Sequence, residues 1–368
     1  MTFLSKIVER EHIFFAALDR FCGNGLPVVL CGNGFIANII KKFLNEAGIK
    51  LYCTAVSEKY LPQVLVAEEN EVKSIEEILK EPGKFNYIIG FQSCDDSFLM
   101  SLKRNAQEIL IFDPSAIEMS AAGFIDYQFC VENCDYLESF YASLNDSLSR
   151  EILIAYLNQR ISGKIGYLEP YYQDNPYFDL KIIKLSNKEI FVDCGAYDGD
   201  TVLSFLSNLE ERNLDPAEKI YAFEPDVSNF NQLLKNTRHL LNVQCFQSGV
   251  WLYHDQLAFT KNGDLNSGIN IDNSGSKVNV HSIDEIVEND AVTFIKMDIE
   301  GSEQQALIGA EKTIINNKPV LAICLYHRLD DLLNIPKYIK SLYAGYRFYL
   351  RWHHKKYAYE FVLYALPY

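Results

Sequence analysis

Carboxylate side chains stand at the ends of two apolar segments in the second half of the chain, where they could bind a positively charged ligand and a ribose. Asp193 follows the apolar residues 190–192 and precedes a turn that contains two glycines. Glu224 follows the next such segment, residues 219–223. A carboxylate beside the turn repels a diphosphate but favours a cationic or zwitterionic ligand. A carboxylate at the tip of the second strand suits the two hydroxyls of a ribose.

The elements that must position these carboxylates are strands, turns and helices in alternation. In residues 189–200 an apolar strand breaks into a turn, and helical spacing begins at Thr201. Gly195 and Gly199 permit backbone conformations that other residues avoid, and the helix beyond them offers unpaired N–H groups to a ligand. In an open α/β sheet, ligands bind beyond the carboxyl ends of the strands, so we expect the site at the turn that follows this strand.

Later segments are predicted to bring more polar residues to the same edge. A third apolar segment leads to Ser248–Gly249, and a fourth leads to Asp298. A fifth, residues 319–325, reaches Tyr326–His327. The chain ends with two segments that pair as a hairpin through residues 353–356. Strand–helix alternation with a terminal hairpin predicts an α/β fold whose sheet is mostly parallel with one reversed strand.

Three motifs occur in this half in a fixed order: DCGAYDGDT at 193–201, AFEPD at 222–226 and FIKMDIEGSEQQALIGA at 294–310. Together they resemble the FkbM family of S-adenosylmethionine-dependent methyltransferases, and the resemblance covers roughly residues 177–364. It implies a Class I methyltransferase fold, which is a Rossmann-like seven-stranded sheet with a terminal antiparallel hairpin. It also implies S-adenosyl-L-methionine as the cofactor.

The resemblance implies a role for each polar strand end in binding this cofactor. We expect Asp193 to face the methionine ammonium group, Glu224 to hold the ribose hydroxyls and Ser248–Gly249 to border the adenine. Asp298 should lie near the transferred methyl group. The full set of expected cofactor-binding residues is Asp193, Gly195, Ala196, Tyr197, Gly199, Asp200, Thr201, Glu224, Pro225, Asp226, Ser248, Gly249 and Asp298.

The resemblance further implies O-methylation, and we favour a hydroxyl of a saccharide or nucleotide-linked sugar in glycan or secondary-metabolite biosynthesis. The acceptor atom must lie about 3 Å from the methyl group, and an alcohol acceptor benefits from a base. Asp298, Glu300 and His327 are the catalytic candidates, with Glu300 or His327 as the base. Alternatively, residues 300–303 are only an acidic helix start. The three side chains could also bind a divalent metal, although we expect none.

An aromatic segment precedes the first strand of this half and could contact the acceptor. In the family this segment lies beside the active site, so Tyr171, Tyr172 and Tyr177 are candidate acceptor contacts. The alternative is that these aromatic side chains only pack beneath a loop.

The first third of the chain predicts a second, smaller Rossmann-like unit. A strand is followed by GNGFIA at 32–37 and then by a helix. Gly32, Gly34 and Ala37 match a G-x-G-x-x-A turn that could bind a nucleotide or nucleotide sugar. The acidic residue expected about twenty positions later is represented only by Glu58. The alternative is a tight turn in a structural or dimerising domain.

We therefore predict three parts of the chain. Residues 1–125 form a Rossmann-like domain of the nucleotide-binding type, residues 126–178 form a helical connector with a substrate-side segment, and residues 179–368 form the FkbM-type methyltransferase domain. The alternative function is an NAD- or nucleotide-sugar-binding enzyme or scaffold that works through the GNGFIA turn, with an inactive methyltransferase fold. Against an oxidoreductase, the first part offers only His12 as a proton donor.

The composition indicates which classes of partner and which cellular compartment to expect. The net charge of −15 argues against generic binding to nucleic acid or to an anionic membrane, so we expect a small-molecule or glycan acceptor. The sequence contains no run of eighteen apolar residues, so we expect no membrane span. The N-terminus does not resemble a signal peptide. The nine scattered cysteines fit reduced thiols in the cytoplasm, and Cys130 with Cys134 is poor evidence for zinc. The aromatic helices are compatible with a homodimer.

Overall fold

The computed structural model describes residues 2–63, 72–92, 94–118, 123–179, 181–260, 268–270 and 276–368. The chain divides into two compact units. The N-terminal unit comprises Met1–Glu132 and Ala155–Glu169, and the C-terminal unit comprises Asn133–Ile154 and Pro170–Tyr368. Within the described ranges, no helix is both long enough and apolar enough to cross a bilayer.

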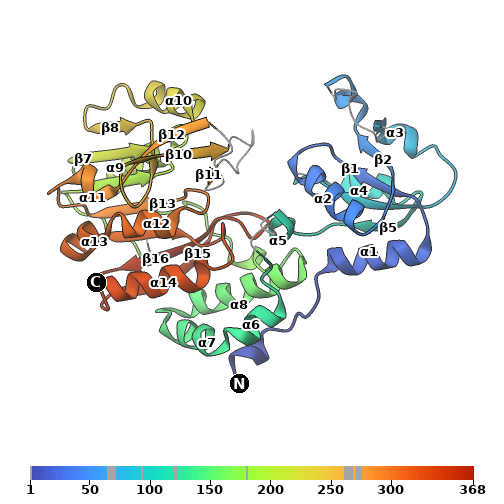
Figure 1. Cartoon of the computed structure of the whole chain (residues 1–368), viewed down its shortest axis with the longest axis horizontal. Coiled ribbons are helices and arrows are strands. Elements are labelled where there is room, and N and C mark those ends of the chain that lie inside the picture. The colour runs from blue at the N-terminus through green and yellow to red at the C-terminus, as the bar shows by residue number, and fades with distance from the viewer. Residues whose placement is uncertain are drawn as a thin grey trace. The chain divides into compact units, whose positions relative to one another are not determined.

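The N-terminal unit is built on a five-stranded sheet in the order β3-β2-β1-β4-β5, and every neighbouring pair is parallel (Figure 1). Its strands are β1 (Val28–Cys31), β2 (Leu51–Val56), β3 (Val72–Ser74), β4 (Phe85–Ile89) and β5 (Ala106–Leu110). This order confirms the predicted Rossmann-like arrangement. The sequence did not predict β3, because its three residues include a lysine and a serine and lack an apolar run.

Helices cover both faces of this sheet because alternate residues of a buried strand point to opposite faces. Val28 and Leu30 pack with helices α1 (Ile13–Asn24) and α2 (Phe35–Glu46). Val29 and Cys31 pack on the opposite face, where residues of two further helices join them. These helices are α3 (Ile75–Ile78) and α4 (Asp96–Leu102).

The C-terminal unit is built on a seven-stranded sheet in the order β15-β16-β14-β13-β6-β7-β8. Only β16 runs antiparallel to its neighbours, so the predicted mostly parallel sheet with one reversed strand is confirmed. Its strands are β6 (Ile190–Cys194), β7 (Lys219–Phe223), β8 (Val243–Phe246), β13 (Phe294–Met297), β14 (Val320–Cys324), β15 (Arg347–Trp352) and β16 (Phe361–Leu366).

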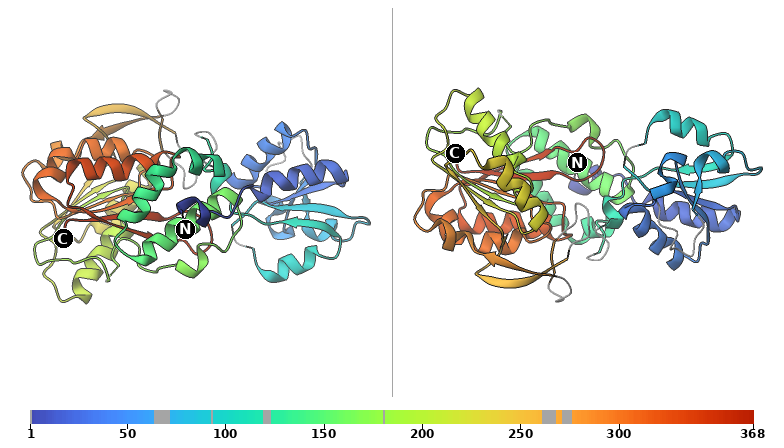
Figure 2. Two further views of the ribbon diagram at one scale, coloured as in Figure 1. Left: turned by 90° about the horizontal axis from the view of Figure 1, so that it is seen from below. Right: turned by 90° about the horizontal axis from the view of Figure 1, so that it is seen from above.

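Helices also cover both faces of the seven-stranded sheet. Figure 2 shows the yellow-green helices on one face and the orange to red helices on the other. The first group is α9 (Asp200–Glu211) and α10 (Val227–Thr237), and the second is α11 (Ile283–Val287), α12 (Glu303–Ile308), α13 (Glu311–Asn317) and α14 (Asp331–Leu342). Phe191 of β6 lies at the centre of the core, with its ring centroid 4.5 Å from that of Phe205 and 5.6 Å from that of Phe294.

A second, smaller sheet of the C-terminal unit has the order β11-β10-β12-β9 and was not predicted. Its strands are β9 (Gly249–Val250), β10 (Asp255–Thr260), β11 (Gly268–Asn270) and β12 (Ser276–His281). The sequence from Lys261 to Lys277 is rich in asparagine, glycine and serine, a composition that is typical of loops. The short strands on either side of it were therefore missed.

The predicted helical connector contains α6 (Tyr127–Glu132), α7 (Cys134–Ser143) and α8 (Ser147–Ser162). Its residues are divided between the two units, because the breaks between the units fall after Glu132, within α8 after Ile154, and after Glu169. The start of α8 is held by Asp146, whose carboxylate accepts a hydrogen bond from the Ser149 N–H (2.8 Å). The same carboxylate lies 2.8 Å from a guanidinium nitrogen of Arg351 on β15.

Arg351 is expected to be a large contributor to the stability of the C-terminal unit. It is 2 % exposed, and its guanidinium lies 3.1 Å from the carboxylate of Asp179 in addition to its contact with Asp146. The change Arg351→Met would leave the Asp179 carboxylate buried without its partner. Such losses cost about 3–5 kcal/mol of unfolding free energy. Urea denaturation followed by tryptophan fluorescence measures the loss.

The control for this prediction is Arg347→Met, because Arg347 is exposed on the same strand. The double variant Arg351→Met/Asp179→Asn should recover part of the stability, since it removes the orphaned charge. Equal midpoints for Arg351→Met and Arg347→Met would contradict the prediction.

Candidate active site

The glycine turn after β6 is pressed against the end of β13. Gly195 has φ +85°, and a Cβ atom added there would lie 2.0 Å from the carbonyl oxygen of Asp298. The N–H groups of Gly195 and Ala196 donate to the carbonyl of Phe223 (3.1 and 2.9 Å), which ties the turn to β7. Gly199, with φ +93°, precedes the first residue of α9. Only a glycine lets the chain pass this close to the neighbouring strand end.

Glu224 lies at the tip of β7, where the sequence predicts a ribose-binding carboxylate. It is 6 % exposed, and its two oxygens accept hydrogen bonds from the N–H groups of Tyr197 (3.0 Å) and Asp226 (2.8 Å). Burial raises the pKa of Glu224 to about 7, although the two N–H donors oppose the shift. Each oxygen keeps lone-pair capacity for a further donor. Asp226 instead caps α10 by accepting from the Ser228 N–H (2.8 Å).

Asp193 lies beneath the glycine turn and is fully buried. Its carboxylate is 3.2 Å from the ammonium group of Lys296, which faces it from β13. Lys296 also donates to the carbonyl of Gly195 (2.6 Å). Its pKa is raised because the carboxylates of Asp193 and Asp298 more than offset burial. Contact between Asp193 and a methionine ammonium group stays a prediction, since the carboxylate is already paired with Lys296.

The three predicted catalytic side chains lie together at the carboxyl ends of β13 and β14. His327 Nε2 is 3.4 Å from a carboxylate oxygen of Asp298 and 3.5 Å from one of Glu300. Its Nδ1 is 2.8 Å from Glu303, a fully buried residue at the start of α12. His327 Nε2 makes no hydrogen bond within the described residues. The sequence did not single out Glu303, although its position three residues after Glu300 could have indicated a second inward-facing carboxylate.

The charged groups of this cluster shift one another's pKa values. Burial alone would lower the pKa of His327, but Glu303, Glu300 and Asp298 raise it well above its usual value. Burial raises the pKa of Glu300 to about 8, with His327 opposing the shift. Lys296 and His327 outweigh burial and lower the pKa of Asp298. The surrounding carboxylates therefore favour the protonated form of His327, and the two neighbouring cations favour the ionised form of Asp298.

Backbone strain occurs at three residues of the predicted site, one of which is Tyr177 with φ +71°. Tyr197 in the glycine turn has φ +48°, and Glu300 has φ +55°. Such left-handed values are uncommon for residues other than glycine, and they persist only where the surroundings impose them. Tyr197 and Glu300 lie at the carboxyl edge of the sheet, where ligands bind in this class of fold.

Of the three predicted acceptor-side tyrosines, only Tyr177 joins the catalytic cluster. Its hydroxyl donates to one oxygen of Asp298 (3.1 Å), while the hydroxyl of Tyr326 donates to the other (3.2 Å). Tyr172 instead donates to Asp174 and packs edge-on against Trp352. Tyr171 ends the short helix η4 (Glu169–Tyr171) and is only partly exposed.

Ser248, at the predicted adenine border, has a buried hydroxyl that lacks a hydrogen-bond partner within the described part of the chain. A buried polar atom without a partner costs free energy, so a ligand that hydrogen-bonds it would be favoured. Gly249 begins β9 immediately afterwards. This hydroxyl and the free lone pairs of Glu224 fit a bound nucleoside.

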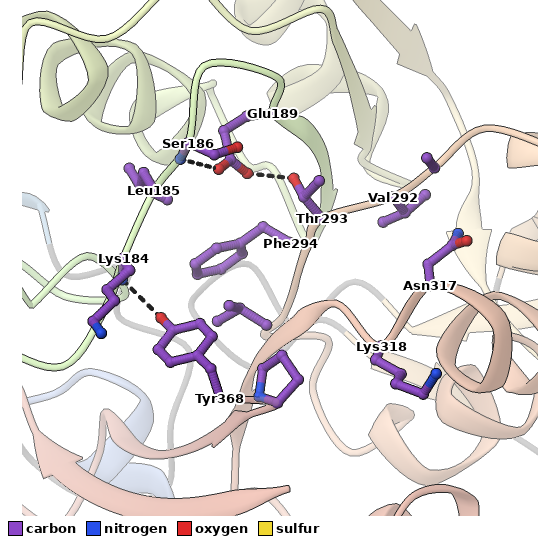
Figure 3. Close-up of a pocket in the computed structure, with 13 residues that line it drawn as sticks. Lys184, Leu185, Ser186, Glu189, Val292, Thr293, Phe294, Asn317, Lys318 and Tyr368 are labelled. Atoms are coloured by element: carbon purple, nitrogen blue, oxygen red, sulfur yellow. Dashed lines mark hydrogen bonds between the residues drawn. The ribbon is translucent and has the colours of Figure 1, made fainter. Parts of the chain in front are cut away.

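A hollow lies at the edge of the sheet opposite the candidate active site, beside the amino ends of β6, β13 and β14 (Figure 3). It encloses about 370 Å³. Glu189 in its wall accepts hydrogen bonds from the Ser186 N–H and the Thr293 hydroxyl, and the Tyr368 hydroxyl accepts one from the Lys184 N–H (2.7 Å). These polar groups already form hydrogen bonds with one another. Ligands of open α/β sheets bind at the other edge, beyond the carboxyl ends of the strands. We assign no function to this hollow.

The GNGFIA turn of the N-terminal unit lies between β1 and α2. Gly32 has φ +111°, and an added Cβ would lie 3.0 Å from the carbonyl oxygen of Gly90. Gly34 is the N-cap of α2, and Ala37 packs against Gly90. Packing of the turn and of α2 against Gly90, which follows β4, is sufficient to account for Gly32 and Ala37. Nucleotide binding here stays a prediction.

Comparison with known proteins agrees with this geometry. Residues 193–348 match the family model described as the methyltransferase FkbM domain. The chain is similar to the structure of methyltransferase FkbM from Methylobacillus flagellatus KT, with 23% identity and a TM-score of 0.72 over 96% of this chain and 98% of that one. No curated protein shows significant similarity to it.

Two further structures are similar over a smaller part of the chain. An rRNA methylase from Streptococcus thermophilus is 14% identical over 49% of this chain and 87% of its own, with a TM-score of 0.32. A putative methyltransferase from Streptococcus mutans in complex with SAH is 14% identical over 49% of this chain and 89% of its own, with a TM-score of 0.30.

Proposed function

We propose that the protein transfers a methyl group from S-adenosylmethionine to a hydroxyl of a saccharide or nucleotide-linked sugar, because residues 193–348 match the family model of the methyltransferase FkbM domain. The observation that carries this proposal is the cluster at the carboxyl ends of β13 and β14. There the Nε2 atom of His327 is oriented through Nδ1 by Glu303 and has no hydrogen-bond partner within the described residues. A hydroxyl acceptor has a proton to lose, and such an imidazole can receive it.

The cofactor would be held along the carboxyl ends of β6, β7 and β8. Glu224 would accept hydrogen bonds from the ribose hydroxyls through the lone pairs that its backbone donors leave free. Ser248 would give its unpaired hydroxyl to the adenine, and the turn at Gly195 would face the methionine part. When bound, S-adenosylmethionine supplies a sulfonium whose methyl group is open to in-line attack. The chain itself contributes position and charge.

The acceptor would approach over Asp298, Glu300 and His327. The surrounding carboxylates favour the protonated form of His327, and this proton must leave before the imidazole can act as a base. A nearby positive charge favours this loss, because like charges disfavour the protonated imidazole. Asp298, held by the hydroxyls of Tyr177 and Tyr326, would orient the acceptor. The saccharide class rests on analogy with the family and is the part that needs the most direct test.

The test begins with calorimetric titration of the full chain with S-adenosylmethionine and with its demethylated product. We expect micromolar binding that the change Glu224→Ala weakens by more than about tenfold, since it removes hydrogen bonds to a charged group. The control is Glu218→Ala, because Glu218 is exposed near the start of β7. No binding by the folded protein would overturn the methyltransferase proposal.

The acceptor is tested separately with sugars and nucleotide sugars, and NMR of the product identifies the methylated oxygen. Transfer to a sugar hydroxyl supports the full proposal. Cofactor binding together with transfer only to non-sugar hydroxyls or to nitrogen would overturn the acceptor class and leave the cofactor assignment intact.

A further inference from the structure

Two histidines and a glutamate converge in the small sheet of the C-terminal unit, apart from the catalytic candidates. One nitrogen each of His254 and His281 and one carboxylate oxygen of Glu285 lie within 4.8 Å of one another. They come from the residue before β10, the end of β12 and the first turn of α11. None of the three is among the residues proposed to take part in methyl transfer.

The register of the small sheet explains why the two histidines meet. Strands β10 and β12 are antiparallel, and Asp255 lies opposite Val280. Continuing this ladder by one residue places His254 opposite His281. Side chains of directly opposed residues have Cβ atoms about 4.5–5.5 Å apart. The two imidazole rings are accordingly stacked, with centroids 4.5 Å apart and an angle of 8° between their planes.

The third side chain is positioned by the cap of α11. The hydroxyl of Ser282 accepts a hydrogen bond from the Glu285 N–H (3.3 Å), which fixes the first turn of the helix directly after β12. Glu285 is four residues after His281, and its carboxylate lies 4.0 Å from His281 Nδ1. The N–H of Trp251 donates to the carbonyl of His281 (2.8 Å) and holds the other end of the loop that carries His254.

The ring of His281 stacks on that of His254, but one of its nitrogens has no hydrogen-bond partner among the described residues. Its Nδ1 atom is shielded from solvent and makes no hydrogen bond within the described residues. A separation of 4.0 Å from Glu285 is too long for a hydrogen bond. The neighbouring ring of His254 would repel a second positive charge if both imidazoles were protonated. An unpaired imidazole nitrogen that faces a second imidazole and a carboxylate is suited to a cation that all three can share.

We propose that His254, His281 and Glu285 bind one divalent transition-metal ion, with Zn²⁺ as the best match. Two imidazoles and one carboxylate are the donor set of zinc sites that keep a position open for water. Imidazole nitrogen favours Zn²⁺ over Mg²⁺, which prefers oxygen ligands. Small movements of the exposed His254 and Glu285 side chains would bring the three atoms to bonding distance. The ion would join β10, β12 and α11.

The experiment uses the full chain, first stripped of metal with a chelator and then titrated with Zn²⁺ by calorimetry. We expect one equivalent to bind and the thermal midpoint to rise, because an ion that binds the folded state stabilises it by mass action. His254→Ala and His281→Ala should each weaken binding by more than about 100-fold, since even residues that only orient a ligand are worth about 10–100-fold. Mg²⁺ should bind far more weakly.

The matched control is His239→Ala, which removes an exposed histidine from a turn of the same unit and should leave binding unchanged. Three results would overturn the proposal. One is the absence of saturable binding of one equivalent. Another is binding that His254→Ala and His281→Ala leave intact. The last is binding that is lost in His327→Ala or after alkylation of the cysteines, because the ion would then occupy another site.

Discussion

Replacing His327 with alanine should lower kcat about 100- to 10,000-fold, the range that a positioned general base contributes. Its Nε2 is open towards Asp298 and Glu300, whereas its Nδ1 is held by Glu303. Affinity for S-adenosylmethionine should change little, because the proposed cofactor contacts lie on β6, β7 and β8. Methyl transfer under saturating cofactor, together with calorimetry, separates the two effects.

The pH dependence of methyl-transfer activity tests this prediction most directly. His327 must be neutral to accept a proton, and its pKa is raised well above the usual value by the surrounding carboxylates. Activity of the wild type should therefore rise with pH on the alkaline side of neutrality. Glu303→Gln removes one of the carboxylates that raise this pKa, so the rise should move to lower pH. His327→Ala should lose that limb, and an unchanged limb in this variant would show that another group is the base.

Replacing Gly195 with alanine should reduce kcat/KM about 100-fold or more. The added Cβ would lie 2.0 Å from the carbonyl oxygen of Asp298, and the residue would keep a φ of +85° that disfavours alanine. Both effects push the turn away from β13, and a displacement of about 1 Å at a reacting centre can cost about 100-fold. Calorimetry should show weaker cofactor binding in the same variant.

Two other glycines provide a graded control for this change. Gly199→Ala meets only flexible side-chain atoms of Leu233 and Thr237, so it should carry the backbone strain with less displacement. Gly34→Ala in the N-terminal unit meets nothing within 4 Å and should be nearly neutral. Thermal unfolding identifies any variant that fails to fold. A folded Gly195→Ala protein with wild-type turnover would refute the close approach of the turn to β13.

Most parallel strands of both units, β3 excepted, could be predicted because they are short and largely apolar runs bounded by turn residues. Lys219–Phe223 and Ile190–Cys194 are buried on both faces, so their sequences show nearly continuous apolar runs. The polar residues that follow them could be placed at one edge for the same reason. Glu224 and Asp298 were found in this way, from local order along the chain.

Other features depend on register between distant segments, which the local pattern does not contain. Lys296 faces Asp193 because β13 and β6 pair with these two residues side by side. Glu303 reaches His327 because the start of α12 lies next to the end of β14. A lysine in an otherwise apolar strand was a visible signal, but its partner was not.

The same limit hid the pair of histidines. His254 and His281 are separated by a segment whose composition is typical of a loop, and only the ladder between β10 and β12 brings them together. A short strand that ends in histidine has no distinctive periodicity. By contrast, the family resemblance implied that the segment around Tyr177 lies beside the site, without indicating which tyrosine would reach Asp298.

Carboxylates outnumber cationic groups where β13 and β14 end. Asp298, Glu300 and Glu303 surround His327, with Lys296 beneath them. Once Glu300, whose pKa burial raises to about 8, is ionised, the cluster is net negative and would attract a donor that carries a positive sulfur. Methyl transfer turns that sulfur into a neutral thioether, so the attraction disappears with the reaction. The site should therefore bind the spent cofactor less tightly than the fresh one. The acidic cluster would in this way help to drive product exchange in each catalytic cycle.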